Sequence, residues 1–101
     1  MVIWTPLAQA DLKAIHTRIA KDAPLNAKKV AADIINKTNA TLSLPHDALG
    51  KKVPELDRDD VREIHIHAWR VIYHVQADKK FVLTLFHKRR DLKPDDIKLN
   101  Q

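Results

Sequence analysis

Residues 61–90 contain most of the chain's strand-forming side chains, and this segment limits the folds that the chain can adopt. Three runs within it are rich in β-branched and aromatic residues: VREIHIH, RVIYHVQ and KFVLTLFHK. Short breaks at Ala68-Trp69 and at residues 77–79 separate these runs. Strands joined by such short connections must run antiparallel, so the segment predicts a three-stranded meander.

The faces of this meander follow from its pairing register, because side chains alternate along a strand and paired residues share a side. If each hairpin closes through an even number of loop residues, His67 pairs with Arg70, and Ala77 pairs with Lys80. The nearly apolar face then holds Arg62, Ile64, Ile66, Val71, Tyr73, Val75, Val82, Thr84 and Phe86. The opposite face holds Glu63, His65, His67, Arg70, Ile72, His74, Leu83, Leu85 and His87. This register predicts a row of His67, Arg70 and His87 across the more polar face.

Two amphipathic helices are predicted ahead of the meander. Residues 2–4 suit a short strand, after which Thr5 can cap a helix that begins at Pro6. Helical spacing predicts a buried stripe of Ala8, Leu12, Ile15 and Ile19, with Asp11, Lys13, His16 and Lys21 toward water. A second helix, starting near Pro24, would bury Ala27, Val30, Ala31, Ile34, Ile35, Thr38 and Leu42.

These elements predict an α+β fold in a single domain spanning residues 1–101. The helices would form an antiparallel hairpin that packs on the apolar face of the meander. Residues 45–60 contain Pro45, Gly50 and Pro54 and therefore suit a connecting loop at the sheet edge. After Arg90, the chain would form either one helical turn starting at Pro94 or a tail.

The composition indicates a folded protein with an acidic partner. Hydrophobic residues make up 45% of the chain and there is no cysteine, so a disulfide framework is excluded. No apolar run approaches the ~20 residues that span a bilayer, and we expect a soluble, cytoplasmic protein. The formal charge of +5 favours nucleic acid or an acidic protein segment as partner, although a purely solubilising role fits as well.

The row of His67, Arg70 and His87 has the residue types needed for acid–base chemistry on a phosphodiester. Imidazoles titrate near neutral pH, and a guanidinium can hold a phosphate through two parallel hydrogen bonds. The alternative is a solvated sheet face on which these residues have no catalytic role. Histidines on adjacent strands, without thiolate or carboxylate partners, are weak evidence for a metal, so neither metal nor cofactor is expected.

A basic run follows the third strand. Lys88, Arg89 and Arg90 lie beside the predicted polar face, where they could contact phosphates. Trp69, in the first predicted turn, could anchor a partner or stack on a base, or it could fold back on the sheet.

Several segments, taken in order, resemble the RelE/ParE superfamily of bacterial toxins from toxin-antitoxin modules. They are Trp4 with residues 8–12, GKKVPEL at 50–56, VREI at 61–64, RVIYHV at 70–75 and LFHKRRDL at 85–92. The resemblance implies a strand, a helical hairpin and an antiparallel sheet. It also implies a cognate antitoxin whose acidic, partly disordered segment folds over the toxin in a hetero-oligomer.

The superfamily includes RelE-like mRNA endonucleases that act on the ribosome and ParE-like poisons of DNA gyrase. Arg70 resembles the family arginine of the third sheet strand, and Arg89 resembles a second active-site arginine. The positions of the RelE-like lysines hold Val61 and Glu63, and that of the catalytic tyrosine holds Asp95.

Another nuclease branch uses Glu, Arg and His, for which Glu55, Arg70 and His87 are the possible counterparts. The VPEL and HKRRDL segments are closer to ParE-like proteins, so gyrase poisoning is the leading hypothesis. Lys88, Arg89, Arg90, Trp69 and His67 are then the candidate contact residues. The alternatives are an mRNA endonuclease and a non-toxic module that binds an antitoxin or nucleic acid.

Overall fold

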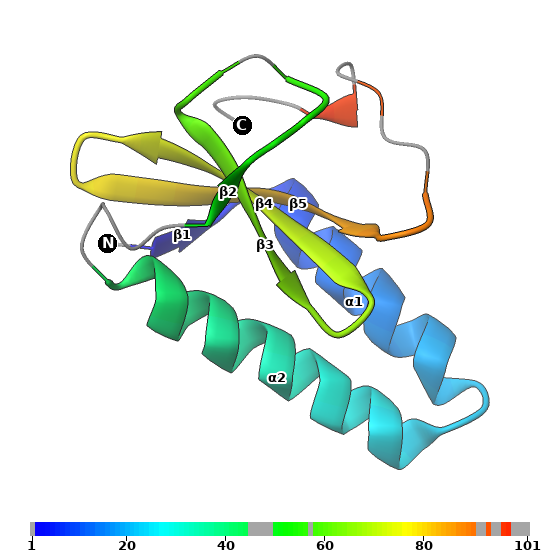
Figure 1. The fold of residues 1–101 in the computed structure, drawn as a ribbon. Coiled ribbons are helices and arrows are strands. Elements are labelled where there is room, and N and C mark those ends of the chain that lie inside the picture. The colour runs from blue at the N-terminus through cyan, green and yellow to red at the C-terminus, as the bar shows by residue number, and fades with distance from the viewer. Residues whose placement is uncertain (1, 45–49, 57, 91–92, 94–95, 98–101) are drawn as a thin grey trace.

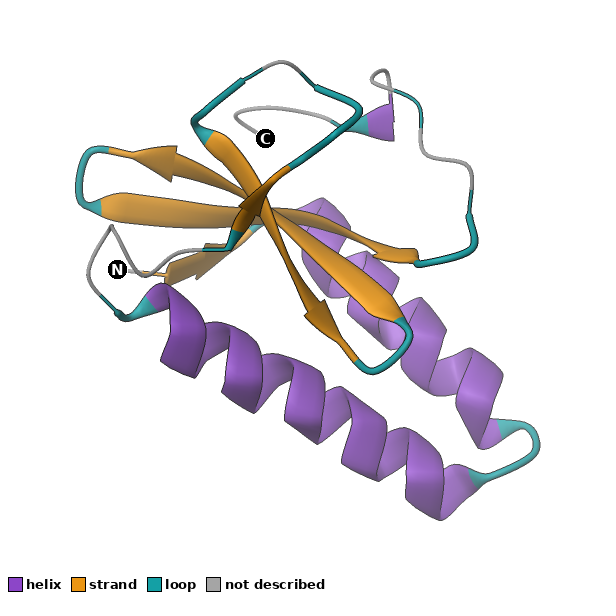
Figure 2. Ribbon diagram, viewed as in Figure 1, coloured by secondary structure: helices purple, strands orange, loops and turns teal. Residues whose placement is uncertain are grey.

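The computed structural model describes residues 2–44, 50–56, 58–90, 93 and 96–97. Two helices cover one face of a five-stranded mixed sheet (Figures 1 and 2), which agrees with the predicted α+β class. The sheet order is β1-β5-β4-β3-β2, and the predicted antiparallel meander forms its centre. The strands are β1 (Val2–Trp4), β2 (Lys51–Lys52), β3 (Val61–Ile66), β4 (Trp69–Gln76) and β5 (Lys79–His87); the helices are α1 (Pro6–Ala20) and α2 (Pro24–Leu42).

Thr5 fixes the start of α1 against the sheet. Its side-chain oxygen accepts the N–H of Ala8, as a helix cap does, and its hydroxyl donates to the carbonyl of Val82. Pro6 occupies the first helical turn, where its missing N–H costs nothing. Strand β1 meanwhile pairs in parallel with β5, so the N-terminal segment is attached to an outer strand of the meander.

The main core lies between the helices and the sheet. The predicted helical stripes supply much of it, since Ala8 and Ile15 of α1 and Val30, Ile34 and Leu42 of α2 are buried there. The prediction is wrong for Ile35, which is 37% exposed. The sheet contributes Ile66, Val71, Tyr73, Val75, Val82 and Leu85 to this core.

A second core covers the opposite face of the sheet, which was predicted to be polar. Residues 53–56 and Ile97 fold over this face, where they bury side chains of the meander. Figure 1 shows these segments on the side of the sheet away from the helices. The buried members are Val53, Val61, Ile72, Leu83, Phe86 and Ile97.

The strand pairing differs from the predicted register. Ile66 pairs with Trp69, not His67 with Arg70, so the first hairpin closes through the two residues His67 and Ala68. Arg70 thus pairs with His65, and this offset of two residues leaves the faces of β3 and β4 as predicted. The second hairpin also closes one residue earlier than predicted, because Gln76 pairs with Lys79 and Lys80 pairs with Val75, not with Ala77. Across β4 and β5, however, Ile72 pairs with Thr84 while Tyr73 pairs with Val82.

Leu83 is therefore an extra residue in β5, which forms a β-bulge. Beyond the bulge the predicted faces are reversed. Leu85 packs in the helix-side core and Phe86 in the second core, whereas the sequence placed them the other way round. His87 consequently pairs with Trp69 instead of joining the row of Arg70.

Both tight turns use residues with left-handed backbone conformations. His67 has φ of 54° and Ala77 has φ of 52°, although neither is glycine. Two-residue hairpin turns require positive φ because their twist must match that of the flanking strands. The hairpins are therefore held by strand pairing and core packing at a local conformational cost.

The remaining predictions concern the connecting loop and the C-terminal segment. Strand β2 lies within the predicted loop and pairs with β3, while positions 45–49 and 57 lie outside the described residues. Pro94 and Asp95 also lie outside them, but Asp96 donates its N–H to the carbonyl of Lys93 in a short turn. No helix in the described part of the chain has the length and apolar character needed to cross a membrane.

Candidate functional site

Arg70 is a buried ionic link between the sheet and the segment that covers it. Its side chain extends from β4 beneath residues 53–56 and is only 7% exposed. The two terminal nitrogens of Arg70 donate to the two carboxylate oxygens of Glu55, at 2.9 and 2.7 Å. Nε of Arg70 donates to Glu63 Oε1 at 2.8 Å, and Nη2 reaches the same oxygen. The guanidinium is therefore held by two carboxylates from different segments.

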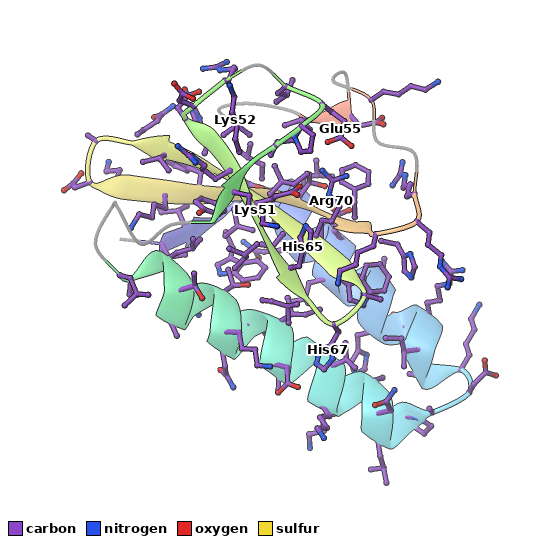
Figure 3. The ribbon with its side chains drawn as sticks, in the orientation of Figure 1. Lys51, Lys52, Glu55, His65, His67 and Arg70 are labelled. Atoms are coloured by element: carbon purple, nitrogen blue, oxygen red, sulfur yellow. The ribbon has the colours of Figure 1, made fainter. Side chains whose placement is uncertain are left out.

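His65 extends this network to the surface. Its Nε2 lies 2.9 Å from Glu63 Oε2, and the imidazole is partly exposed whereas Glu63 is buried. Figure 3 shows Glu55, Arg70 and His65 together on the face of the sheet away from the helices. The network thus joins two carboxylates, a guanidinium and an imidazole.

The ionisation of the network follows from these contacts. The hydrogen bonds from Arg70 lower the pKa of Glu55 below its ordinary value, because they favour the carboxylate. The bonds to Glu55, followed by those to Glu63, raise the already high pKa of Arg70. Arg70 was predicted on a solvated face with its guanidinium available to a phosphate, but the structure places it in a buried and fully engaged position.

His67 lies elsewhere, at the tip of the β3–β4 hairpin. Its Nε2 is 2.8 Å from Asp33 Oδ2, so the pair connects the hairpin tip to α2. This contact lowers the pKa of Asp33. The predicted row of His67, Arg70 and His87 does not form, because the first hairpin turns one residue earlier and the bulge moves His87 to the other face.

His87 instead lines a cavity of about 200 Å³ between α1 and the ends of β4 and β5. Its ring meets the indole of Trp69 edge to face, with centroids 5.0 Å apart. Trp69 also packs against the helix-side core, which is the fold-back alternative considered from the sequence. Arg18 of α1 and Arg90 complete the polar lining of this cavity.

The basic run after β5 is exposed and firmly anchored. The N–H of Lys88 donates to the carbonyl of Ala68, and the N–H groups of Arg89 and Arg90 both donate to His87. The Arg90 guanidinium lies 4.4 Å from the centre of the Phe86 ring, which is a cation–π distance. The backbone of this turn is therefore fixed while its charged ends reach solvent.

Comparison with known families shows which family the chain belongs to. The sequence matches the family model of the ParE toxin of type II toxin-antitoxin systems, parDE, over residues 2–92. The chain belongs to the ParE toxin family. The resemblance inferred from its ordered segments is thereby confirmed.

Solved structures agree with this family at the level of the fold. The ParE-family chain is similar to a chain of the chromosomal ParDE toxin-antitoxin system from P. aeruginosa, with a TM-score of 0.72 and 20% identity. The match covers 85% of this chain and 92% of that chain. No curated protein matches the sequence.

The sequence did not predict two features of this ParE-family member. Arg18 reaches the cavity of His87, and its spacing from Ile15 and Asp11 on one helix face was the available signal. Asp11 was predicted to face water, but its carboxylate accepts hydrogen bonds from Thr84 Oγ1 and the N–H of Leu85. Among the described residues, no three His, Asp or Glu side chains are grouped to hold a metal ion.

Proposed function

We propose that this ParE-family toxin arrests growth by poisoning DNA gyrase and that a cognate antitoxin neutralises it. The observation that carries the proposal is the dispersal of the candidate nuclease residues. Arg70 is engaged by two carboxylates, and His87 lies on the other side of the sheet. A gyrase poison requires no proton transfer from these groups, so their separation does not affect it.

The exposed residues after β5 are the proposed contacts with gyrase. Lys88, Arg89 and Arg90 project from an anchored turn, and Arg90 shares its cavity with Trp69. Because the backbone of this turn is already ordered, binding through it requires little further loss of backbone conformational freedom. We expect Arg89→Ala/Arg90→Ala to weaken the complex with gyrase without altering its pH dependence.

The test is inhibition of supercoiling by purified gyrase, together with trapping of cleaved DNA. Wild-type toxin should inhibit, and Arg89→Ala/Arg90→Ala should require at least about tenfold more protein, a loss of about 1.4 kcal/mol. Lys28→Ala/Lys29→Ala is the matched control, because it removes the same charge from exposed positions on α2. Normal supercoiling at high wild-type concentration, with antitoxin binding retained, would refute the proposal.

A second function is favoured by one contact. Glu55 and Arg70, two of the three residues of the Glu, Arg and His nuclease branch, are directly bonded, and His65 joins their network. The alternative is therefore a ribosome-dependent mRNA endonuclease in which His65, not His87, supplies the imidazole. Cleavage of mRNA in the ribosomal A site, lost in His65→Ala but retained in His87→Ala, would establish this alternative.

A further inference from the structure

Exposed cationic side chains are grouped on α1 and on the turn after β5. Arg18 lies at the centre of this group, because it lines one recess with Lys13 and Lys21 and another with Arg90 and His87. Lys13 and Arg18 lie on α1 and Lys21 is its C-cap residue, and the eight steps from Lys13 to Lys21 correspond to about 12 Å of helix. We define this basic face as Lys13, Arg18, Lys21, Lys88, Arg89 and Arg90, all of which are exposed.

The charges of the basic face are not neutralised locally. In the part of the chain that the structure describes, none of its six cations forms an ion pair with a carboxylate. Asp11, an acidic residue that lines one of its recesses, accepts hydrogen bonds from Thr84 and the backbone of Leu85 and forms no ion pair with these cations. The surface therefore presents an excess of positive charge to solvent.

We propose that the basic face binds the phosphate backbone of double-stranded DNA. Its composition favours DNA over an acidic protein segment, since half of its cations are lysines, which are depleted at protein–protein interfaces. Its large apolar neighbour, Trp69, is only partly exposed, and the large exposed hydrophobic residues of the described chain are Leu25, Ile35 and Leu44, on α2 and just after it. Protein–DNA interfaces are, in contrast, polar and strongly positive.

This inference deepens the proposed function and rests on it for its biological setting. A poison that acts while gyrase holds DNA would contact both partners, with residues 88–90 at the junction. The contribution of α1 is the new element, because its cations lie outside the run that the sequence indicated. Binding through phosphates alone would be independent of base sequence and steeply dependent on salt.

The test is fluorescence anisotropy of two labelled duplexes of unrelated sequence, titrated with the full-length chain at 50 to 200 mM KCl. Lys13→Gln/Arg18→Gln/Lys21→Gln is compared with Lys28→Gln/Lys29→Gln/Lys37→Gln, which removes the same charge from exposed positions of α2. Loss of three phosphate contacts should make the slope of log K against log salt shallower by about 2.7. The α1 variant should also bind at least about tenfold more weakly at 100 mM, whereas the control should keep nearly the wild-type slope.

Equal slopes in the two variants would overturn the inference, as would binding of polyglutamate without binding of DNA. Circular dichroism of both variants establishes that they are folded. The gyrase assay is read separately. DNA binding that depends on α1, without gyrase inhibition, would refute the proposed function alone; gyrase inhibition without such DNA binding would refute this inference alone.

Discussion

Arg70→Ala should destabilise the protein severely, because it leaves a buried carboxylate without its cation. The Glu63 side chain is only 5% exposed, and Arg70 donates two hydrogen bonds to its Oε1. Removal of one partner from a buried ion pair costs ~3–5 kcal/mol. Since domains of this size are stable by about 5–15 kcal/mol, the variant would lose a large share of its stability.

Urea unfolding followed by circular dichroism at pH 7 measures this loss. The matched control is Arg89→Ala, which removes an exposed arginine and should change the free energy of unfolding by less than about 0.5 kcal/mol. Glu55→Ala should cost less than Arg70→Ala, because Glu55 is 27% exposed and solvent weakens its interaction with Arg70. The expected cost of Glu55→Ala is about 1–2 kcal/mol, near the lower end of what hydrogen bonds to charged groups contribute.

A double-mutant cycle identifies the cause. If the cost of Arg70→Ala comes from the unpaired charge of Glu63, then Glu63→Gln should relieve part of it, with a coupling energy of about 1–3 kcal/mol. A cost below about 1 kcal/mol for Arg70→Ala, or additive effects in the cycle, would refute the buried-link interpretation. Growth-arrest assays with Arg70→Ala therefore require a measured folded fraction before they can test catalysis.

Three further predictions concern local structure. Ala77→Gly should stabilise the protein by about 0.5–1 kcal/mol in the same unfolding assay. The left-handed conformation of Ala77 costs an L-residue about 1–2 kcal/mol, and the larger conformational entropy that glycine loses on folding offsets part of the gain from removing this cost. A loss of stability would contradict this prediction. Gly50→Ala should cost about 1–3 kcal/mol, since the added Cβ would lie 2.1 Å from the Glu63 carbonyl oxygen, and an unchanged midpoint would show that β2 moves aside without cost. Hydrogen bonds, first from Arg58 and also from His74, lower the pKa of Asp60 from 3.8 to about 2 in the folded protein. The contribution of Asp60 to the free energy of unfolding is therefore fully present above pH 3.8, and it disappears as the pH falls toward 2. The stability difference between wild type and Asp60→Asn should therefore shrink between pH 6 and pH 2, and a constant difference would exclude this linkage.

The meander and helical hairpin could be predicted because their signals are local. Short connections force neighbouring strands to be antiparallel, and the apolar stripes of the two helices, which contain Ile15 and Ile34, repeat at the helical period. The bulge at Leu83 had no such signal. Residues 81–86 are apolar at five of six positions, so either register buries apolar side chains, and alternation cannot reveal a slip of one residue.

The candidate site was harder to predict because its partners are distant in sequence. Arg70 was identified as a key residue, but Glu55 lies fifteen positions away in a segment without a regular pattern. Residues 53–56 were predicted as part of a connecting loop at the sheet edge, and no pattern in them indicated that they would cover the second face of the sheet. That cover converts a face expected to be solvated into a second core, and it changes Arg70 from a candidate phosphate ligand into a buried link.

Ion pairing also affects how much charge the protein presents to solvent. Glu55 and Glu63 share the single positive charge of Arg70, so this group presents less negative charge to solvent than two free carboxylates would. The lysines and arginines of the basic face have no such partners among the described residues. In a chain with a formal charge of +5, exposed and unpaired cations increase association rates with a polyanion most strongly at low ionic strength. Lys28 and Lys29 of α2 are also exposed, so the basic face is distinguished by the grouping of six cations between α1 and the turn after β5.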